Sequence, residues 1–189
     1  STQSRSSAAS DVYKRQMRLL PMKMVSSRRS VLLMGRLLNM EQSFSVSGDK
    51  NMNREEIMTI LPHRDNMLLL DDAENKESTA VGHYTVRGDE FFLKGHFPDN
   101  PVVPGVILCE ILAQSACVLM KDKMSEGKLP VYTGLNNVKF RSPVKPGDTV
   151  EAQCRIKRAK HPFYFAEGIV TVDGRLCASA EFSFAITGV

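Results

Sequence analysis

The sequence has 189 residues, of which 42% are hydrophobic and 24% charged, a composition that is ordinary for a soluble globular protein and sufficient for one domain with a sizeable core. Its longest apolar run, 106–120, is shorter than the roughly 20 residues that a membrane-spanning helix needs. The net charge of +4 comes from residues 1–51, with nine Lys/Arg and three Asp/Glu, whereas residues 52–189 hold sixteen and eighteen. The orderly part is thus slightly acidic, which argues against nucleic acid as a partner.

Residues 1–51 show no regular apolar period. They open with a polar, Ser-rich stretch and continue with a basic stretch that has short apolar patches. This composition is typical of an unstructured extension or of translated sequence upstream of the true start, and a transit peptide or membrane-surface segment is the alternative. The pattern becomes orderly at Met52, and we therefore expect one folded domain at 52–189.

The first elements of this domain are a short helix and two strands. The sequence predicts a helix over 53–60, with Asn53 as its N-cap, two glutamates in its first turn and Pro62 beyond its end. Strands over 67–71 and 78–86 follow, because these stretches are apolar and are bounded by turn residues.

A helix over 106–120 comes next, and its apolar residues leave no polar face, which indicates burial on most sides. After a break at Gly127 and Pro130, the chain predicts strands over 132–141, 149–158, 163–172 and 176–186. This order of elements favours an α+β fold, in which an antiparallel sheet is wrapped around a central apolar helix.

The four cysteines form neither a CxxC pair nor a Cys/His spacing that would bind a metal. We expect all of them to be reduced packing residues, which indicates a reducing cytoplasm. They are Cys109, Cys117, Cys154 and Cys177.

The stretch GHFPDNPVVPGVILCEILAQ, residues 95–114, holds the candidate chemistry. His96 titrates near neutral pH and suits a general base. Gly105 lies at the start of the predicted helix, where free N–H groups can stabilise an oxyanion. Burial of Glu110 raises its pKa and suits a general acid, and Gln114 lies on the same helical face, where it can orient Glu110 or a substrate group. Taken alone, the histidine and the glutamate are more often structural.

Two longer motifs change this preference for a structural role. LPHRDNMLLLD followed by GHFPDNPVVPGVILCEILAQ, with VKFRSPVKPGD further on, strongly resembles the bacterial (3R)-hydroxyacyl-[acyl-carrier-protein] dehydratases of type II fatty acid synthesis, the FabZ family. The resemblance extends from about Met52 to Ile186. It implies a hot-dog fold, in which a sheet wraps around one long helix, and a homodimer as the minimal active unit, often assembled as a trimer of dimers.

The resemblance also implies the reaction and its residues. The family removes water from a (3R)-3-hydroxyacyl thioester on acyl carrier protein to give the trans-2-enoyl thioester, and it needs no metal or redox cofactor. His96 matches the catalytic histidine that takes the C2 proton, and Glu110 matches the glutamate that helps the C3 hydroxyl leave. Gly105 matches the glycine whose N–H polarises the thioester carbonyl. In the family, the histidine and glutamate of one site come from different subunits.

The resemblance leads to expectations for three further residues. Asp99 stands where the family commonly has glycine, and we expect it to face solvent rather than to act on His96. Tyr132 lies close to the position of an aromatic residue that gates the acyl tunnel in some members. His63, in LPHR, recurs in the opening motif of the family, and we interpret it as structural.

A basic cluster lies in the last third of the sequence, where only Asp148 and Glu151 oppose it. Its charge suits docking of the acidic acyl carrier protein, with a solvated surface as the alternative. The cluster consists of Lys139, Arg141, Lys145, Arg155, Lys157, Arg158 and Lys160.

Three other functions remain open at this point. The related dehydratase/isomerase branch carries Asp in place of Glu110, a hot-dog thioesterase would release free thiol, and a non-catalytic acyl-thioester-binding module would need neither His96 nor Glu110. The presence of both residues favours the dehydratase.

Overall fold

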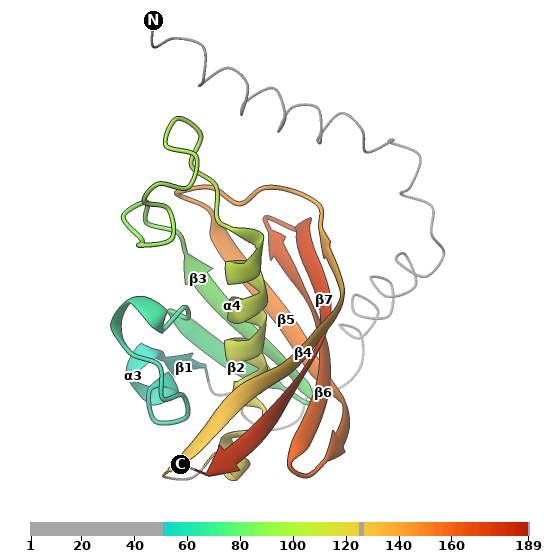
Figure 1. The fold of residues 1–189 in the computed structure, drawn as a ribbon. Helices are drawn as coiled ribbons and strands as arrows, with labels where there is room; N and C mark the ends of the chain where they lie inside the picture. Colours follow the sequence, from blue (N-terminus) through green and yellow to red (C-terminus); the bar gives the residue numbers. More distant parts are fainter. Residues whose placement is uncertain (1–50, 125–126, 189) are drawn as a thin grey trace, which may run out of the picture. The chain divides into compact units, whose positions relative to one another are not determined.

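The computed structural model describes residues 51–124 and 127–188 (Figure 1). The predicted N-terminal extension lies outside the described residues, apart from Asn51. Within the described ranges, no helix is long and apolar enough to cross a membrane.

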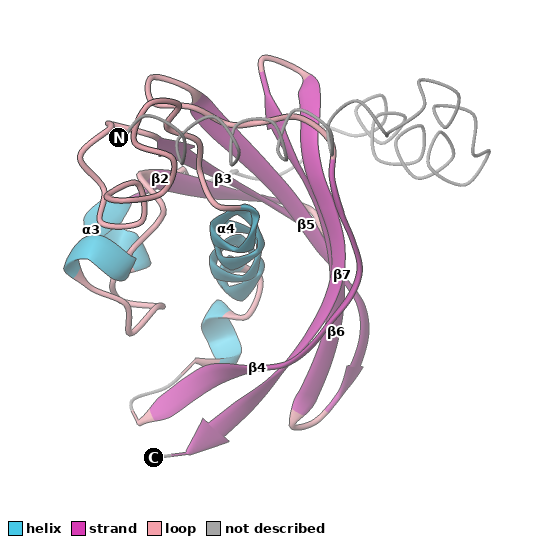
Figure 2. Ribbon diagram, turned by 45° about the horizontal axis from the view of Figure 1, so that its top comes forward, coloured by secondary structure: helices cyan, strands magenta, loops and turns pink. Residues whose placement is uncertain are grey.

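In the described part of the chain, an antiparallel sheet of seven strands curves around the helix α4 (Gly105–Val118), which lies in its concave face (Figures 1 and 2). The strand order is β1-β2-β3-β5-β6-β7-β4, and every pairing is antiparallel. This arrangement confirms the α+β, hot-dog architecture that the sequence predicts. The strands are β1 (Met52–Asn53), β2 (Asp72–Lys76), β3 (Thr79–Thr85), β4 (Lys128–Phe140), β5 (Thr149–Lys160), β6 (Phe163–Val172) and β7 (Arg175–Gly188).

Glycines on the concave face of the sheet allow α4 to pack closely. A Cβ added at Gly82 on β3 would lie 2.7 Å from Leu70 Cδ2 and would also collide with Ser115 of the helix. A Cβ added at Gly168 on β6 would lie 2.8 Å from Leu112 Cδ2 and 2.7 Å from a backbone oxygen of β5. Both contacts are shorter than side-chain packing tolerates, so a larger residue would push the helix from the sheet.

The helix α3 (Arg54–Ile57) confirms Asn53 as the N-cap. Asn53 Oδ1 accepts from the N–H of Glu56 at 3.0 Å, and Glu56 Oε2 accepts from the N–H of Asn53 at 3.1 Å, which completes a capping box. The helix is shorter than the predicted 53–60. Its last turn tightens, and the N–H groups of Ile60 and Leu61 both return to the carbonyl of Ile57.

The strand predicted over 67–71 is wrong. Asp65–Met67 forms a 3₁₀ turn, η3, and the three leucines that follow are fully buried but unpaired in the sheet, since the strand β2 begins only at Asp72. Side chains replace the missing ladder bonds, since the N–H of Leu69 donates to Gln114 and the carbonyl of Leu70 accepts from Arg54. The other predicted strands are confirmed, although β4 begins at Lys128, before the predicted 132.

The prediction of buried, reduced cysteines is confirmed. All four thiols are free and buried. Burial raises the pKa of Cys117 to about 12, with the charge of Glu110 adding to the effect, so this thiol stays protonated at neutral pH.

Candidate active site

Glu110 projects from the middle of α4, and its carboxylate is mostly buried, with 22% of the side chain exposed. Gln114 Nε2, one turn further along the helix, donates to Glu110 Oε1 at 2.9 Å. His63 Nε2 lies 3.4 Å from the same oxygen and comes from the loop between α3 and η3. The charge inside the apolar helix therefore has two polar partners, as a buried carboxylate requires.

The pKa of Glu110 is shifted in the opposite direction to the one predicted from sequence. Burial acts to raise it, but the hydrogen bonds from His63 and Gln114 act together to lower it, and the net pKa lies below the ordinary value of a glutamate. The expectation of a raised pKa was wrong because it considered the helix alone and had no partner at position 63.

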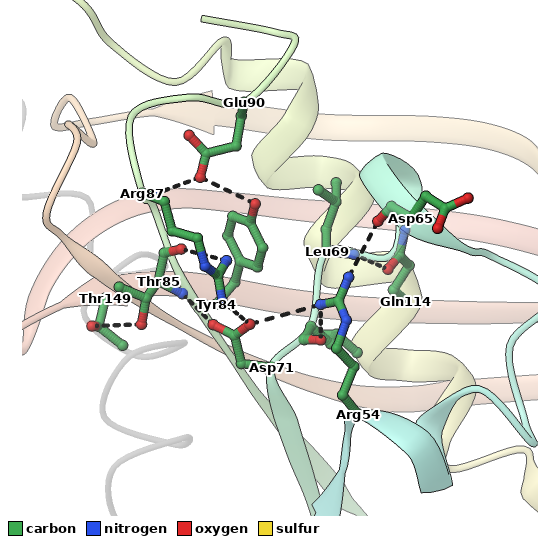
Figure 3. Close-up of polar contacts among 11 residues, drawn as sticks. Arg54, Asp65, Leu69, Asp71, Tyr84, Thr85, Arg87, Glu90, Gln114 and Thr149 are labelled. Carbon is green, nitrogen blue, oxygen red and sulfur yellow. Dashed lines mark hydrogen bonds and ion pairs between the residues drawn. The ribbon is translucent and has the colours of Figure 1, made fainter.

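Gln114 is fully buried and links α4 to the segment at 67–69. Its Oε1 accepts from the N–H of Leu69 at 2.9 Å (Figure 3), which fixes the orientation of the amide. Its Nε2 donates to the carbonyl of Met67 at 2.8 Å and to Glu110. Both amide hydrogens are therefore used within the protein. Of the two roles considered for Gln114, these contacts match the orientation of Glu110 better than a bond to a substrate.

The segment that Gln114 contacts is itself held by Arg54 of α3. Its guanidinium donates to the carbonyl of Leu70 at 2.9 Å and to that of Asp65 at 3.2 Å, and it lies 3.7 Å from the carboxylate of Asp71 (Figure 3). Asp71 in turn accepts from the N–H of Thr85 at 2.8 Å. The extended leucine segment is thereby fixed to both α3 and the end of β3.

A second set of contacts fixes the chain where it leaves β3 for the loop that carries His96. Glu90 accepts from the N–H of Arg87 at 2.6 Å and from the hydroxyl of Tyr84 at 3.2 Å (Figure 3). Burial, with the charge of Glu90, raises the pKa of Tyr84 to about 12, so the phenol remains a donor. The guanidinium of Arg87 donates to Asp71 at 2.6 Å. Tyr84, Arg87 and Glu90 lie outside the motifs quoted above, and only the structure identifies them.

His96 lies in the loop between β3 and α4 and is half-buried. Its N–H donates to the carbonyl of Leu93 at 3.2 Å, and its ring packs on Phe97 at 4.2 Å between centroids. Asp99 is exposed, in the solvent-facing position expected. Within the described residues of one chain, His96 makes no hydrogen bond or ion pair with Glu110.

Gly105 is the first residue of α4, and Pro104 before it supplies no side-chain cap to the free N–H groups. The ring of Phe140, from β4, occupies the space that a side chain at Gly105 would need, with ring atoms 2.6, 2.7 and 2.8 Å from the position of an added Cβ. The sequence predicted a glycine for close approach of a ligand. The structure adds an aromatic ring that requires the same glycine.

Tyr132 ties the strand β4 to the helix α4. Its hydroxyl donates to the carbonyl of Cys109 at 2.6 Å, and its ring meets Phe182 edge-on. Burial raises the pKa of Tyr132, and the nearby charge of Glu110 raises it further. The phenol next to the glutamate is therefore neutral, and its role as a tunnel gate remains a prediction.

Acidic side chains from neighbouring strands offset more of the charge of the basic cluster than the nearby sequence indicated. Strand pairing places Arg155 opposite Glu167, whose side chain is only 3% exposed, and the two form an ion pair. Lys157 lies 3.1 Å from Glu167 and 3.4 Å from Glu181. Asp148 and Glu151 are therefore not the only opposing acids. Arg158 covers the ring of Phe165 at 4.1 Å.

The curved sheet, the buried helix and the carboxylate inside it define a hot-dog protein with a polar site on its central helix. Two solved structures show the same fold. The dehydratase heterocomplex ApeI:P from Xenorhabdus doucetiae aligns with a TM-score of 0.61 at 20% identity, over 70% of this chain and 91% of that one. A point mutant of the fluoroacetyl-CoA-specific thioesterase FlK aligns with a TM-score of 0.51 at 11% identity, over 60% and 90%.

Sequence comparison identifies the family. Residues 72–181 match the family model described as ApeI-like: ApeI dehydratase. The 3-hydroxyacyl-[acyl-carrier-protein] dehydratase FabZ of Clostridium perfringens is 41% identical over 137 residues, which cover 71% of this chain and 99% of the relative. That of Halalkalibacterium halodurans is 41% identical over 135 residues, or 70% and 96%. The chain belongs to the FabZ family of 3-hydroxyacyl-[acyl-carrier-protein] dehydratases, as its motifs predicted.

Proposed function

We propose that this protein removes water from (3R)-3-hydroxyacyl chains on acyl carrier protein and forms the trans-2-enoyl thioester in type II fatty acid synthesis. The observation that carries the proposal is the 41% identity with FabZ dehydratases over nearly their whole length. The buried carboxylate of Glu110 on the central helix supports it, because an acyl chain needs apolar surroundings while the reaction needs one titratable group beside it.

The reaction assigns one role to each of three groups. His96 takes the C2 proton, and the electron pair of that bond forms the C2=C3 double bond. The C3–O bond breaks, and the oxygen leaves as water with a proton from Glu110. The N–H at Gly105 stabilises the charge that develops on the thioester oxygen. Transfer of the proton from His96 to Glu110 then restores both groups.

The lowered pKa of Glu110 adds a condition to this scheme. At neutral pH the carboxylate prevails in the free enzyme. The acid form that serves the leaving hydroxyl is therefore reached with substrate bound, when the thioester covers the site and desolvation of the carboxylate increases.

We further propose a homodimer, assembled in turn as a trimer of dimers, in which each site takes His96 from one subunit and Glu110 from the other. Two observations support it. The two residues form no hydrogen bond or ion pair within the described part of one chain, and the long strand β4 ends the sheet with Val131 and Leu135 each nearly half exposed. An unpaired apolar edge strand favours pairing with another chain.

For the carrier protein, we propose docking on the exposed cations of the basic cluster that no acid pairs within the described ranges. Lys139, Arg141 and Lys160 are exposed and remain candidates, and Arg158 contributes its charge from above an aromatic ring. Arg155 is a weaker candidate because Glu167 offsets its charge. We place the enzyme in the cytoplasm, which its four free thiols support.

The test of the reaction is turnover of 3-hydroxyacyl carrier-protein substrates of graded chain length, with enoyl formation and free thiol measured in the same samples. We expect enoyl thioester without release of thiol. Free thiol in step with substrate loss would make the protein a thioesterase, and binding without turnover would make it an acyl-thioester-binding module.

The test of the shared site is co-expression of His96→Ala and Glu110→Ala chains. Neither mutant homodimer has a complete site, whereas a mixed dimer has one site with both residues. About half of randomly paired dimers are mixed, so about a quarter of wild-type activity should return by symmetry. Purified mixed dimers that are no more active than either mutant would rule out the shared site.

A further inference from the structure

The two carboxylate oxygens of Glu110 have different surroundings. Oε1 accepts from Gln114 Nε2 at 2.9 Å and lies 3.4 Å from His63 Nε2. Oε2 has no hydrogen-bond partner among the residues that the structure describes. Donors stabilise negative charge on the oxygen that they contact, so a proton on this carboxyl group is favoured at Oε2.

We propose that His63 is a positioning residue for the dehydration: with Gln114 it holds Oε1 of Glu110, so that Oε2 carries the proton and faces the C3 hydroxyl of the substrate. The proposal rests on the dehydratase function proposed above. It replaces the interpretation of His63 as a merely structural residue of the LPHR motif.

The backbone around His63 is built to hold the imidazole in place. Arg64 donates to the carbonyls of Leu61 at 2.7 Å, His63 at 2.6 Å and Met58 at 3.0 Å, which closes the turn after α3. Leu61 is fully buried and anchors the turn in the core. Leu61 and Arg64 of LPHR thus hold the turn, and the contact of the His63 side chain is with Glu110.

The polar contacts of the ring point to the same role. Nδ1 of His63 is buried and has no hydrogen-bond partner within the described part of the chain, which is an unfavourable position for a polar atom. An apolar side chain would fill this space without that cost. The contact of Nε2 with Glu110 is what the imidazole provides and an apolar residue would not.

Besides His63, the groups around the carboxylate of Glu110 add no charge to the site at neutral pH. The other titratable groups that interact with the charge of Glu110 are Cys109 and Cys117 on its own helix and Tyr132 on β4. Burial raises the pKa of all three, so they are neutral around pH 7 and add no charge. Gln114 does not titrate.

Two amide variants separate a positioning role from a structural one. Glutamine places its Nε2 donor near the position of the histidine Nε2, whereas asparagine is shorter and reaches only the position of Nδ1. We expect His63→Gln to keep most of kcat. We expect His63→Asn to lose about ten- to one-hundredfold in kcat with little change in KM, because a charge-assisted hydrogen bond and the aim of the reacting oxygen are lost together.

The pH profile provides a second readout. Burial raises the pKa of Glu110, and without the donor at position 63 only the hydrogen bond from Gln114 lowers it. The pKa of Glu110 is therefore expected to rise in His63→Asn but not in His63→Gln. The acid limb of the kcat/KM profile should move to higher pH in the asparagine variant alone. The same shift is expected in the ¹³C titration of the Glu110 carboxyl, with Glu110→Gln used for assignment. This measurement needs no turnover.

Equal kcat and equal Glu110 titration in the two amide variants would overturn the proposal. If His63→Asn fails to fold, the comparison of wild type with His63→Gln decides, and loss of kcat in a folded glutamine variant refutes the role. Absence of turnover in the wild type would refute the dehydratase function instead. The carboxyl titration would then still show whether His63 controls Glu110.

Discussion

The contact between Gly105 and Phe140 makes Gly105→Ala an informative substitution. The new Cβ would lie 2.6–2.8 Å from three atoms of the Phe140 ring, whereas carbon atoms pack at about 3.5–4.0 Å. Either the ring or the start of α4 must therefore move by about 1 Å. Overpacking of this kind costs about 1–3 kcal/mol of unfolding free energy, or a decrease in Tm of a few degrees for a chain of this size.

The effect on catalysis depends on which side moves. Phe140 is half exposed and can turn outward in part, but movement of the helix start would displace the N–H proposed to hold the thioester oxygen. A displacement of about 1 Å costs up to about one-hundredfold in rate, so we expect kcat to fall about ten- to one-hundredfold. The N–H itself remains in Gly105→Ala, so the loss would come from displacement.

The double variant Gly105→Ala/Phe140→Ala identifies the cause. Removal of the ring leaves room for the new methyl group, so we expect kcat to return to the level of Phe140→Ala alone. A double variant as slow as Gly105→Ala would show that the methyl group blocks the substrate directly. If Gly105→Ala turned over substrate at the wild-type rate, the ring of Phe140 would be able to move aside and the glycine would not be required.

Three further substitutions test other parts of the site and fold. Glu110→Gln keeps an oxygen that can accept from His63 and Gln114, so it should fold normally but lose about 10²- to 10⁴-fold in turnover; near-normal turnover would make Glu110 structural. Gly168→Ala should lower the free energy of unfolding by about 1–3 kcal/mol in a denaturant titration, because its Cβ meets β5 and Leu112; an unchanged midpoint would mean that the helix can yield. Charge reversal at Lys139 or Arg141 should raise KM for carrier-protein substrates and leave KM for a small acyl thioester unchanged; equal effects on both substrates would exclude docking.

The regular elements of this fold could be predicted because their patterns are local. The helix at Gly105–Val118 follows from an apolar run without a polar face, and β6 (Phe163–Val172) from a strand pattern bounded by turns. The prediction of a strand over 67–71 was wrong because a short apolar run looks the same in the sequence whether or not it pairs in a sheet. What decides is whether other groups satisfy its backbone, and here Arg54 and Gln114 do so from distant parts of the chain.

In the site, too, the residues in local motifs could be predicted and a partner from a distant part of the chain could not. The family motifs place His96, Gly105 and Glu110 in the sequence, and the helical spacing correctly places Gln114 beside Glu110. No spacing rule connects Glu110 with His63, since a loop and a helix separated by two strands can meet only through the fold. That missing partner reverses the pKa shift, because burial alone raises the pKa of a carboxyl group and donors from the same chain lower it.

The lowered pKa of Glu110 bears on the proposed cycle, in which the same carboxyl group gives up a proton and later regains one. A glutamate with a strongly raised pKa would hold its proton firmly and would donate it reluctantly to a leaving hydroxyl, whereas a fully solvated one would seldom carry a proton at all. In the proposed scheme, Oε1 of Glu110 keeps its donors and Oε2 has no partner among the described residues, so Glu110 would be a carboxylate at rest and would accept a proton at Oε2 when substrate covers the site. In this proposal the oxygen that His63 and Gln114 contact is separate from the oxygen that reacts, and the two contacting side chains come from a loop and from α4 itself.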